Sequence, residues 1–363
     1  MRKLKVGIIG ATGMVGQRFI TLLADHPYFE ISALAAGPRS AGRSYREAVA
    51  GRWKLPCGCP EKVLDMQVLD AADVEAVGSL VDFVFCAVNL PKEETRALEE
   101  LYARQEIPVI SNNSANRWTP DVPMLIPEVN PEHAEVIAAQ RARLGTKRGF
   151  IAVKPNCSIQ GYVGALTPLR KYGIEKIAVT TYQAISGAGR TFSDWEEMND
   201  NIIPFISGEE EKSEREPLRV WGGLDGAGRE IVPAEEPVIS AQCLRVPVSD
   251  GHMAAVFVKF HEKPAEEEIK AAWRDFVPEV QRLSLPSSPE HFITYFEEPD
   301  RPQTRLDSGL YSGMGISVGR LREDRIFDYR FVALAHNTLR GAAGGAVLMA
   351  EFLMRQGYLT PAD

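Results

Sequence analysis

The chain has 363 residues, of which 45% are hydrophobic and 25% charged, the composition of an ordinary soluble globular protein. Its formal net charge of −8 argues against a nucleic-acid partner and against an anionic membrane surface, because both need a basic face. No stretch reaches the roughly 18–20 apolar residues of a membrane-spanning helix, and the length suggests two domains.

The first half of the chain alternates short apolar runs with helical patterns. The apolar runs predict strands at 5–9, 29–36, 81–88 and 107–111, and helical spacing predicts helices at 17–24 and 91–104. Glycines interrupt the first apolar run, which therefore suits a strand and a turn better than a signal peptide. Strands separated by helices imply a parallel, doubly wound sheet of the Rossmann type.

The second half has a different pattern. It predicts strands at 177–182, 243–248 and 253–260 in a mostly antiparallel sheet, a long polar segment at 187–236, and helices at 265–276 and from about 338 to 355. The expected fold class is therefore α/β, with a nucleotide-binding domain over residues 1–155 and an α+β catalytic domain over 156–337. We expect the C-terminal helix, about 338–363, to pack back on the first domain.

A glycine turn follows the first predicted strand. Gly10, Gly13 and Gly16 have GxxGxxG spacing between an apolar strand and a helical stretch. Glycine lets the backbone approach a pyrophosphate closely, and a helix N-terminus supplies free N–H groups and a positive dipole. A tight turn without a ligand is the alternative. The residues expected at the cofactor here are Gly10, Thr12, Gly13, Met14, Val15 and Gly16.

The end of the second strand discriminates between NAD and NADP. Enzymes that use NAD usually place an acidic residue there, which binds the ribose 2′-hydroxyl. Here the strand leads into Arg39, Ser40 and Ala41 without a carboxylate, and the first two suit a 2′-phosphate. We therefore expect NADP as the cofactor; the alternative is that Arg39 is only a solvated loop residue.

Cys157 is the candidate nucleophile, because it precedes a predicted helical stretch. The dipole at a helix N-terminus stabilises a thiolate, so we expect a depressed pKa for this thiol. Cys86 and Cys243 fit the ordinary buried structural cysteine. Cys57 and Cys59 form a CxC pair without a second ligand pair, so no metal site is expected. Five unpatterned cysteines indicate a reducing compartment, and hence a cytoplasmic location.

His252 is the candidate acid/base, because a nucleophile needs a base and this histidine follows Gly251 in a loop just before a strand. Taken singly, a loop histidine is more often a surface residue. His336, at the start of the last predicted helix, is interpreted as structural. The other histidines, all expected at the surface, are His26, His133, His261 and His291.

Five motifs occur in an order that resembles the aspartate-β-semialdehyde dehydrogenase family, particularly its archaeal and fungal branch. They are the glycine turn, SNNSANR at 111–117, PNCS at 155–158, YQAISGAG at 182–189, and RVPV with GH at 245–252. They span nearly the whole chain and are specific as a set. The resemblance implies an NADP-dependent oxidoreductase of lysine, methionine and threonine biosynthesis. It also implies a homodimer or homotetramer, with 156–337 as catalytic and dimerisation domain.

The resemblance implies roles position by position. Cys157 is similar to the family's acyl-forming nucleophile, His252 to its acid/base catalyst, and Gln183 to the residue that orients the substrate. Which of the glutamates at 209–211 contacts substrate stays open, and a solvated helix face is equally consistent with that run of charges. The implied substrate-binding residues are Arg245, Arg117, Glu209, Lys212 and Asn156. The implied cofactor contacts near the nicotinamide are Ser186, Gly187 and Asn337.

In the implied reaction, the Cys157 thiolate attacks the β-carbonyl of L-aspartyl-4-phosphate, phosphate leaves, and NADPH reduces the thioester to L-aspartate-4-semialdehyde. We expect His252 to relay the proton because the pKa of histidine is ordinarily near neutrality. Helix N–H groups near Cys157 are expected to stabilise the oxyanion.

The chain departs from the family at one place. Ile159 and Gln160 follow Ser158, where the family usually has Ser-Thr or a similar small pair, and malonyl-CoA reductase has glutamine near this place. The acyl substrate therefore stays open among aspartyl phosphate, N-acetylglutamyl phosphate and malonyl-CoA. An alternative of another class is a catalytically silent NADP-binding regulator, against which Cys157 and His252 argue.

Overall fold

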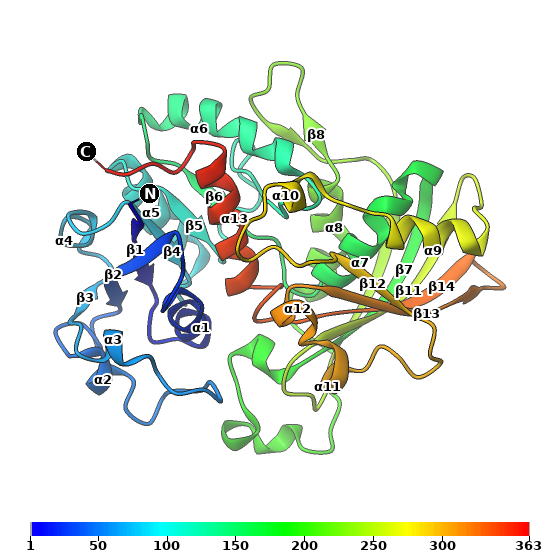
Figure 1. The fold of residues 1–363 in the computed structure, drawn as a ribbon, viewed down its shortest axis with the longest axis horizontal. Helices are drawn as coiled ribbons and strands as arrows, with labels where there is room; N and C mark the ends of the chain where they lie inside the picture. The colour runs from blue at the N-terminus through cyan, green and yellow to red at the C-terminus, as the bar shows by residue number, and fades with distance from the viewer. Residues whose placement is uncertain (1, 363) are drawn as a thin grey trace.

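Two six-stranded sheets organise the chain, which the computed structural model describes over residues 2–362 (Figure 1). The blue and cyan first half forms one sheet with its helices, and the green to orange segment forms the other. The last helix, in red, lies between them. Within the described residues, no helix combines the length and apolarity that crossing a bilayer requires.

The first sheet is wholly parallel, in the order β3-β2-β1-β4-β5-β6. Its strand order reverses between β1 and β4, the point where ligands bind in doubly wound sheets. The strands are β1 Leu4–Ile9, β2 Phe29–Ala36, β3 Val68–Asp70, β4 Phe83–Cys86, β5 Val109–Ser111 and β6 Ile151–Val153. The helices of this half are α1 Met14–Leu23, α2 Tyr45–Ala48, α3 Glu61–Leu64, α4 Val74–Gly78, α5 Lys92–Arg104, η1 Pro131–Val136 and α6 Ile137–Leu144.

The second sheet is mixed, in the order β10-β7-β11-β14-β13-β12. Its three central pairings are antiparallel, whereas the outermost pairings, β10 with β7 and β12 with β13, are parallel. The strands are β7 Ile174–Gln183, β10 Val238–Arg245, β11 His252–Phe260, β12 Ile293–Phe296, β13 Ile316–Glu323 and β14 Tyr329–Ala335. A separate ribbon pairs β8 Gly223–Leu224 with β9 Ile231–Val232.

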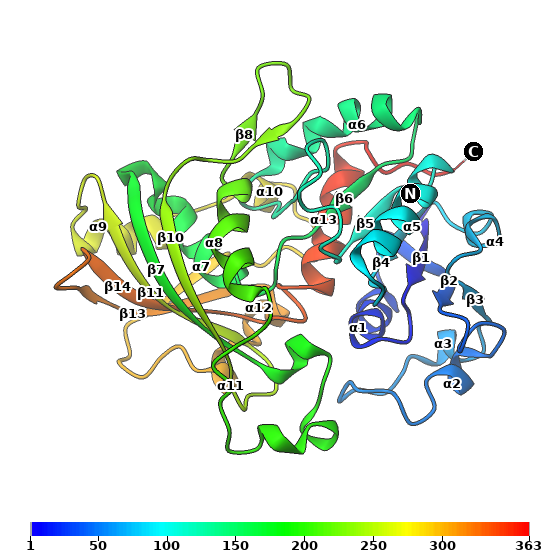
Figure 2. The same ribbon diagram turned by 180° about the vertical axis from the view of Figure 1, so that it is seen from behind.

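One face of the second sheet is covered and the other is open. Along β11 the residues alternate strictly between buried and partly exposed, as expected for a sheet with one packed face. Helix α7 packs against β11, β13 and β14, while α8 packs along β10 (Figure 2). The helical segments of this half are α7 Gln160–Leu166, η2 Thr167–Tyr172, η3 Ile185–Ala188, η4 Phe192–Asp194, η5 Glu196–Met198, α8 Glu209–Val220, α9 Glu266–Arg274, α10 Glu279–Arg282, α11 Thr304–Asp307 and α12 Leu310–Gly313.

The last helix, α13 Ala343–Arg355, packs against α1 and β5 of the first half. It is buried over most of its length, which matches its nearly continuous apolar sequence. A buried bond between His26 Nε2 and Glu351 Oε1, at 2.8 Å, fastens it to the loop after α1. The prediction that His26 lies at the surface is therefore wrong, because this histidine is hydrogen-bonded to a buried carboxylate inside the helix interface.

The predicted fold class is confirmed: a parallel Rossmann-type sheet and a mixed, mostly antiparallel one. Some boundaries differ. The strand predicted at 243–248 is β10 at 238–245, since Pro247 ends the pairing that the apolar residues suggested. The last helix begins at Ala343 rather than near 338, because residues 338–342 form a turn. The polar segment at 187–236 is not featureless, since it contains α8, β8 and β9.

Candidate active site

The glycine turn has the geometry of a dinucleotide cradle, and its three glycines differ in what they do. Gly10 has φ +90°, and a Cβ there would lie 2.4 Å from the carbonyl oxygen of Ala87. A Cβ on Gly16 would lie 2.3 Å from the oxygen of Gly10. The fold itself therefore requires glycine at both positions. Around Gly13, by contrast, the nearest atom to an added Cβ is 3.6 Å away, so this glycine borders open space.

Helix α1 directs its N-terminus into this open space. Gly13 is the N-cap, and no acidic side chain occupies the first turn. The first amide groups of a helix have no intrahelical partner, so those around Thr12, Met14 and Val15 can receive an anion. These residues are partly exposed, as a binding surface requires. The turn therefore fits the pyrophosphate of a dinucleotide.

The turn after β2 carries the residues predicted for the 2′-phosphate. Arg39 is exposed, Ala41 is partly exposed and Ser40 is buried at the base of the turn. The Ser40 hydroxyl accepts a bond from Arg52 Nη2 at 3.4 Å. A second guanidinium, which the sequence pattern did not indicate, thus lies beside the predicted pair. Its presence strengthens the positive character of this turn.

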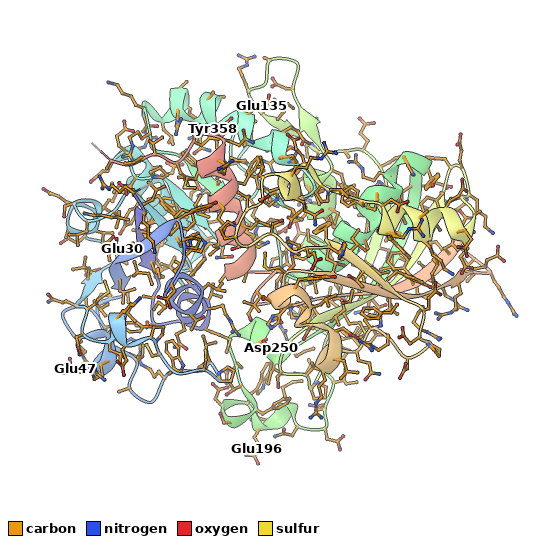
Figure 3. The ribbon with its side chains drawn as sticks, viewed as in Figure 1. Glu30, Glu47, Glu135, Glu196, Asp250 and Tyr358 are labelled. Atoms are coloured by element: carbon orange, nitrogen blue, oxygen red, sulfur yellow. The ribbon has the colours of Figure 1, made fainter. Side chains whose placement is uncertain are left out.

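A cavity of about 330 Å³ lies where the two halves meet. Met14 and Arg18 of α1 line it from one side, and Ser186 and Asp250 from the other. Figure 3 shows Asp250 at this junction. Lys54 bridges the halves next to the cavity, with Nζ 2.8 Å from the oxygen of Gly189 and 2.6 Å from Asp194 Oδ2.

Cys157 lies in the turn between β6 and α7, three residues before the helix begins. Burial and, to a smaller extent, the nearby Glu209 carboxylate raise the pKa of this thiol to about 11, against the opposing charges of Arg117, Arg245 and Lys212. The expectation of a depressed pKa is therefore wrong for the free site. The helix starts too late, and the turn is too buried, for the dipole to dominate.

The amide next to the nucleophile is also unavailable for an oxyanion. The Ser158 N–H donates to Asn156 Oδ1 at 2.7 Å, and the Ser158 hydroxyl donates to the same oxygen at 2.6 Å. The prediction that helix N–H groups near Cys157 stabilise the oxyanion is not supported at this amide. The charged side chains of Arg245, Arg117 and Lys212 are the other groups available near the thiol.

His252 is fully enclosed at the start of β11, so the surface interpretation of this histidine is wrong. Burial lowers its pKa to about 3, helped by the charge of Arg245, so the ring is neutral at working pH. The expected pKa near neutrality is therefore also wrong. The backbone N–H of Ala184 donates to Nδ1 at 3.0 Å, which leaves the ring proton on Nε2.

The Nε2 atom of His252 is buried without a hydrogen-bond partner among residues 2–362. A Cβ added to Gly187 would lie 3.0 Å from this atom and 3.0 Å from Arg245 Nη1. The missing side chain of Gly187 therefore lets the imidazole and the guanidinium converge on one point. A buried donor without an acceptor is unfavourable, unless a ligand oxygen supplies the acceptor.

Asn337 and Ser186, both predicted near the nicotinamide, fix the loop that carries His252. Asn337 Oδ1 accepts the N–H of Gly251 at 2.9 Å, and its Nδ2 donates to the Ser186 hydroxyl at 2.8 Å. Ser186 also lines the cavity between the halves. The structure thus places this pair between the predicted cofactor cleft and the imidazole.

Glu209 is the centre of a buried polar network. Its carboxylate accepts bonds from Lys212 Nζ at 2.7 Å, from Asn156 Nδ2 at 3.0 Å and from Gln183 Nε2 at 3.1 Å. Burial raises the pKa of Glu209, but Lys212 and these hydrogen bonds lower it by more. The net pKa therefore lies below the ordinary range of a glutamate, and the carboxylate is ionised at neutral pH. Four of the predicted residues therefore meet in one place.

The three consecutive glutamates at 209–211 have different environments in the structure. Only Glu209 faces the network, because Glu210 binds Gln242 at 2.6 Å on β10 and Glu211 pairs with Arg215 at the surface. The solvated-face interpretation is thus correct for Glu211 and wrong for Glu209. Position on α8, rather than residue type, makes the difference.

Hydrogen bonds hold Arg117 beside the loop that carries Cys157. Its Nη1 donates to Glu216 Oε1 at 2.8 Å, and its Nε donates to the oxygen of Lys154 at 2.9 Å. The other oxygen of Glu216 accepts the N–H of Asn156 at 2.6 Å. Glu216 was not predicted, although it lies seven residues after Glu209 on the same helix face.

The other cysteines and His133 lie away from this network. Cys86 and Cys243 are buried within strands, as predicted. Cys57 and Cys59 lie in a loop, and no group of three potential metal ligands occurs among residues 2–362. His133 is buried, with Nε2 3.1 Å from the oxygen of Gly222, so its predicted surface position is wrong.

Fold and site together define a class of enzyme: a dehydrogenase with a nicotinamide dinucleotide domain and a separate catalytic chamber. The family model described as "Semialdehyde dehydrogenase, NAD binding domain" matches residues 5–137. The model described as "Semialdehyde dehydrogenase, dimerisation domain" matches residues 166–340. The first range contains the strands of the first sheet except β6 and the first residue of β1, and the second range contains all strands of the second sheet.

Full-length relatives narrow the class. The chain is 42% identical to aspartate-semialdehyde dehydrogenase of Aspergillus fumigatus, over 98% of this chain and 99% of the relative. It is 45% identical to the enzyme of Methanothermobacter thermautotrophicus, over 96% and 98%. The crystal structure of the Candida albicans enzyme with NADP matches with a TM-score of 0.88 at 40% identity, covering 98% of this chain and 100% of that one.

The chain belongs to the aspartate-semialdehyde dehydrogenase family. The resemblance to its archaeal and fungal branch is confirmed, and so is the predicted class of enzyme, an oxidoreductase that uses a nicotinamide dinucleotide.

Proposed function

We propose that this protein reduces L-aspartyl-4-phosphate to L-aspartate-4-semialdehyde and phosphate with NADPH, through a thioester on Cys157. The single observation that supports it most is a chamber in which the charges of Glu209 and Arg245 act on the thiol, while Arg245 converges at Gly187 with the unpartnered Nε2 of His252. The family membership supports the same reaction. This step would supply the biosynthesis of lysine, methionine and threonine.

The chamber is suited to an α-amino acid. Glu209 is an ionised, buried carboxylate, which can pair with a substrate ammonium group. Arg245 is a buried guanidinium with Nη1 bound to the oxygen of Ala184 at 2.7 Å, so its remaining N–H groups can receive a carboxylate in a fork. N-acetylglutamyl phosphate and malonyl-CoA lack a free ammonium group. The Glu209 site therefore favours aspartyl phosphate over both alternatives.

The covalent steps follow from the positions of the groups. Cys157 attacks the β-carbonyl carbon, the bond to phosphate breaks, and a thioester remains on the sulfur. The 4-phosphate lies toward Lys212 and Arg117, whose charges face Cys157. NADPH, bound at the glycine turn and at the turn with Arg39, supplies the hydride that reduces this thioester.

His252 acts as a neutral hydrogen-bond donor. Its Nδ1 is occupied by the Ala184 amide, so Nε2 carries the proton, and this atom lies at Gly187 beside Arg245 without a protein partner. The carbonyl oxygen of the thioester gains negative charge when hydride arrives, and a preorganised donor stabilises that charge most strongly in a dry site. When the tetrahedral species collapses to the aldehyde, the sulfur is released as the leaving group.

A spectrophotometric assay tests the proposed function. Purified protein is mixed with NADPH and, in separate cuvettes, with aspartyl phosphate, N-acetylglutamyl phosphate or malonyl-CoA. We expect NADPH oxidation with aspartyl phosphate only. Oxidation with another of the three, or with none, would overturn the substrate assignment or the enzymatic assignment, respectively.

The open face of the second sheet supports a homodimer. Ala178 and Phe257 on this face line a shallow hollow with Ile326, which is 85% exposed. Large apolar side chains gathered on an uncovered sheet favour burial against a second copy. Light scattering should give a dimer, or a tetramer built from it, and Phe257→Glu should shift the mass toward the monomer.

The domain limits and the compartment belong to the same proposal. We place the boundary at residues 155 and 156, between β6 and the nucleophile turn, with α13 assigned to the cofactor-binding half because it packs on α1. The five cysteines are all free thiols. A reducing cytoplasm is the compartment in which they stay reduced.

A further inference from the structure

Arg18 of α1 is a cation of the cofactor half without a protein partner. The residue is partly exposed and lines the cavity of about 330 Å³ between the two halves. Over residues 2–362, its Nε is buried without a hydrogen-bond partner, and no carboxylate oxygen lies within 4.0 Å of its guanidinium nitrogens. Burying part of a charged group without an acceptor is unfavourable, so the position indicates that a ligand supplies the acceptor.

The other cations that line this cavity are satisfied by the protein. Lys54 Nζ donates to the oxygen of Gly189 at 2.8 Å and pairs with Asp194 at 2.6 Å. Arg190 Nη1 donates to the backbone oxygen of Asp194 at 3.0 Å. On the part of the cavity wall that the structure describes, Arg18 is therefore the cation that the fold leaves available for an anion.

The position of Arg18 on α1 brings its charge toward the glycine turn. Met14 and Arg18 are four residues apart, so they share one face of the helix, and both line the cavity. Side chains of a helix lean toward its N-terminus, so the long arginine side chain extends back along the first turn. That turn carries the positive end of the helix dipole and no acidic residue. Both features favour an anion in the same place.

The opposite wall of the cavity contributes one carboxylate, that of Asp250. Its charge and that of Arg18 act on the same histidine. Burial lowers the pKa of His336 to about 4, with the carboxylate of Asp250 acting against this shift and the guanidinium of Arg18 acting with it. Asp250 is therefore the protein group that competes with a ligand for Arg18.

A nicotinamide dinucleotide offers two anionic groups, the pyrophosphate and, in NADP, the ribose 2′-phosphate. The turn after β2, with Arg39 and Ser40, suits the 2′-phosphate. Arg18 instead lines the cavity that extends to Ser186 of the catalytic half. The pyrophosphate, which fits the start of α1, lies between these two ends of the cofactor. It is therefore the anionic group that suits Arg18.

We propose that Arg18 is a cofactor-binding residue whose guanidinium group pairs with the pyrophosphate, on the side of the nicotinamide. It supplies charge-assisted hydrogen bonds to a group that NADPH and NADH share. Arg18 thereby differs from Arg39, whose proposed partner is present in NADPH alone. The inference rests on the proposed binding of the cofactor at the glycine turn, and it does not depend on the acyl substrate.

Calorimetric titration of the full-length protein with three ligands tests the proposal. The ligands are NADPH, NADH and adenosine 2′-monophosphate, which carries the 2′-phosphate but no pyrophosphate. Arg18→Met keeps a long, helix-forming side chain and removes the charge. It should raise the dissociation constants of both dinucleotides about tenfold or more, as expected for lost hydrogen bonds to a charged group. The dissociation constant of adenosine 2′-monophosphate should not change.

Two further variants control for charge and fold. Arg18→Lys keeps the charge and should bind both dinucleotides more tightly than Arg18→Met. Arg46→Met removes an exposed arginine of the same half, paired with Asp65, and should change none of the three dissociation constants. Thermal unfolding gives an independent measurement. Without cofactor, Arg18→Met should have the Tm of the wild type, whereas NADPH should raise the Tm of the variant by less.

Asp250→Asn separates the proposal from an ion pair that joins the two halves. If the pyrophosphate is the partner of Arg18, removal of this carboxylate should leave NADPH binding as tight as in the wild type, or tighter. A loss equal to that in Arg18→Met, with no further loss in the double variant, would show that Arg18 and Asp250 pair with each other. That result would overturn the inference.

Unchanged dissociation constants for NADPH and NADH in folded Arg18→Met protein would also overturn it. Weakening of NADPH alone would assign Arg18 to the 2′-phosphate, and equal weakening of all three ligands would indicate a general loss of binding. Both results contradict the proposed pairing. None of these measurements needs turnover, so they stand or fail separately from the three-substrate assay.

Discussion

The two halves of this molecule build their sites from different materials. The cofactor cradle is made of backbone: Gly10 at φ +90°, Gly16 against the oxygen of Gly10, and the amide groups at the start of α1. The catalytic chamber is made of side chains that come from β7, α8, β10 and β11. The backbone cradle is specified by a short stretch of sequence and is partly exposed to solvent. The side-chain chamber is buried, so its properties depend on which of its groups stay charged after burial.

The largest expected effect lies in the chamber. Cys157→Ser should lower turnover by at least about 10⁴-fold, because no other group can form the acyl intermediate. The dissociation constant for NADPH should change little, since the cradle lies in the other half. Fluorescence titration of NADPH and a steady-state assay measure the two quantities. Residual activity near that of the wild type would contradict the nucleophile assignment.

His252→Gln should lower kcat by about 10²–10³-fold, the range observed when a preorganised donor to an oxyanion is removed. Because burial holds the pKa of His252 near 3, the ring does not change charge between about pH 5 and pH 8, which spans the ordinary pKa of histidine. The single-turnover rate of NADPH oxidation should thus show no inflection from this residue.

His261→Gln is the matched control, since His261 is half exposed and pairs with Glu236 on the surface. It should leave kcat unchanged. A wild-type inflection near pH 6.5 that disappears in His252→Gln would show that the ring titrates, and the neutral-donor mechanism would fail.

Much of the fold could be predicted from the sequence, and so could the candidate site residues that the structure brings together around Glu209, because strands, turns and short motifs are local. The glycine turn is contained within eleven residues, and the RVPV and GH motifs predict Arg245 and His252 as site residues. Their protonation could not be predicted. The pKa of Cys157 is raised and that of His252 is lowered by burial under segments distant in the sequence.

The orientation of Glu209 illustrates a signal that was available but not used. Glu209, Ser213 and Glu216 recur at i, i+4 and i+7, and all three are buried on the inner face of α8. That spacing distinguishes Glu209 from its neighbours and indicates Glu216 as well.

A pair of glutamate variants sharpens the comparison within the chamber. Glu209→Gln should lower kcat/KM for aspartyl phosphate about ten- to hundredfold, because it removes the charge available to the substrate ammonium group. Glu211→Gln, two residues away on the same helix, should have no effect because that side chain is at the surface. Equal losses in both variants would mean that the charge of α8 as a whole, rather than the buried network, attracts the substrate.

The smallest expected effect belongs to the cofactor half. Arg39→Ala should raise the dissociation constant for NADPH about tenfold and leave that for NADH unchanged, if this exposed guanidinium binds the 2′-phosphate as proposed. Arg46→Ala, which removes an exposed arginine paired with Asp65, is the control for a general loss of positive charge. The effect should be modest because Ser40 and Arg52 remain beside the same phosphate position. Equal weakening of NADPH and NADH would show that Arg39 supports the turn itself, and the preference for NADP would then have to come from Arg52.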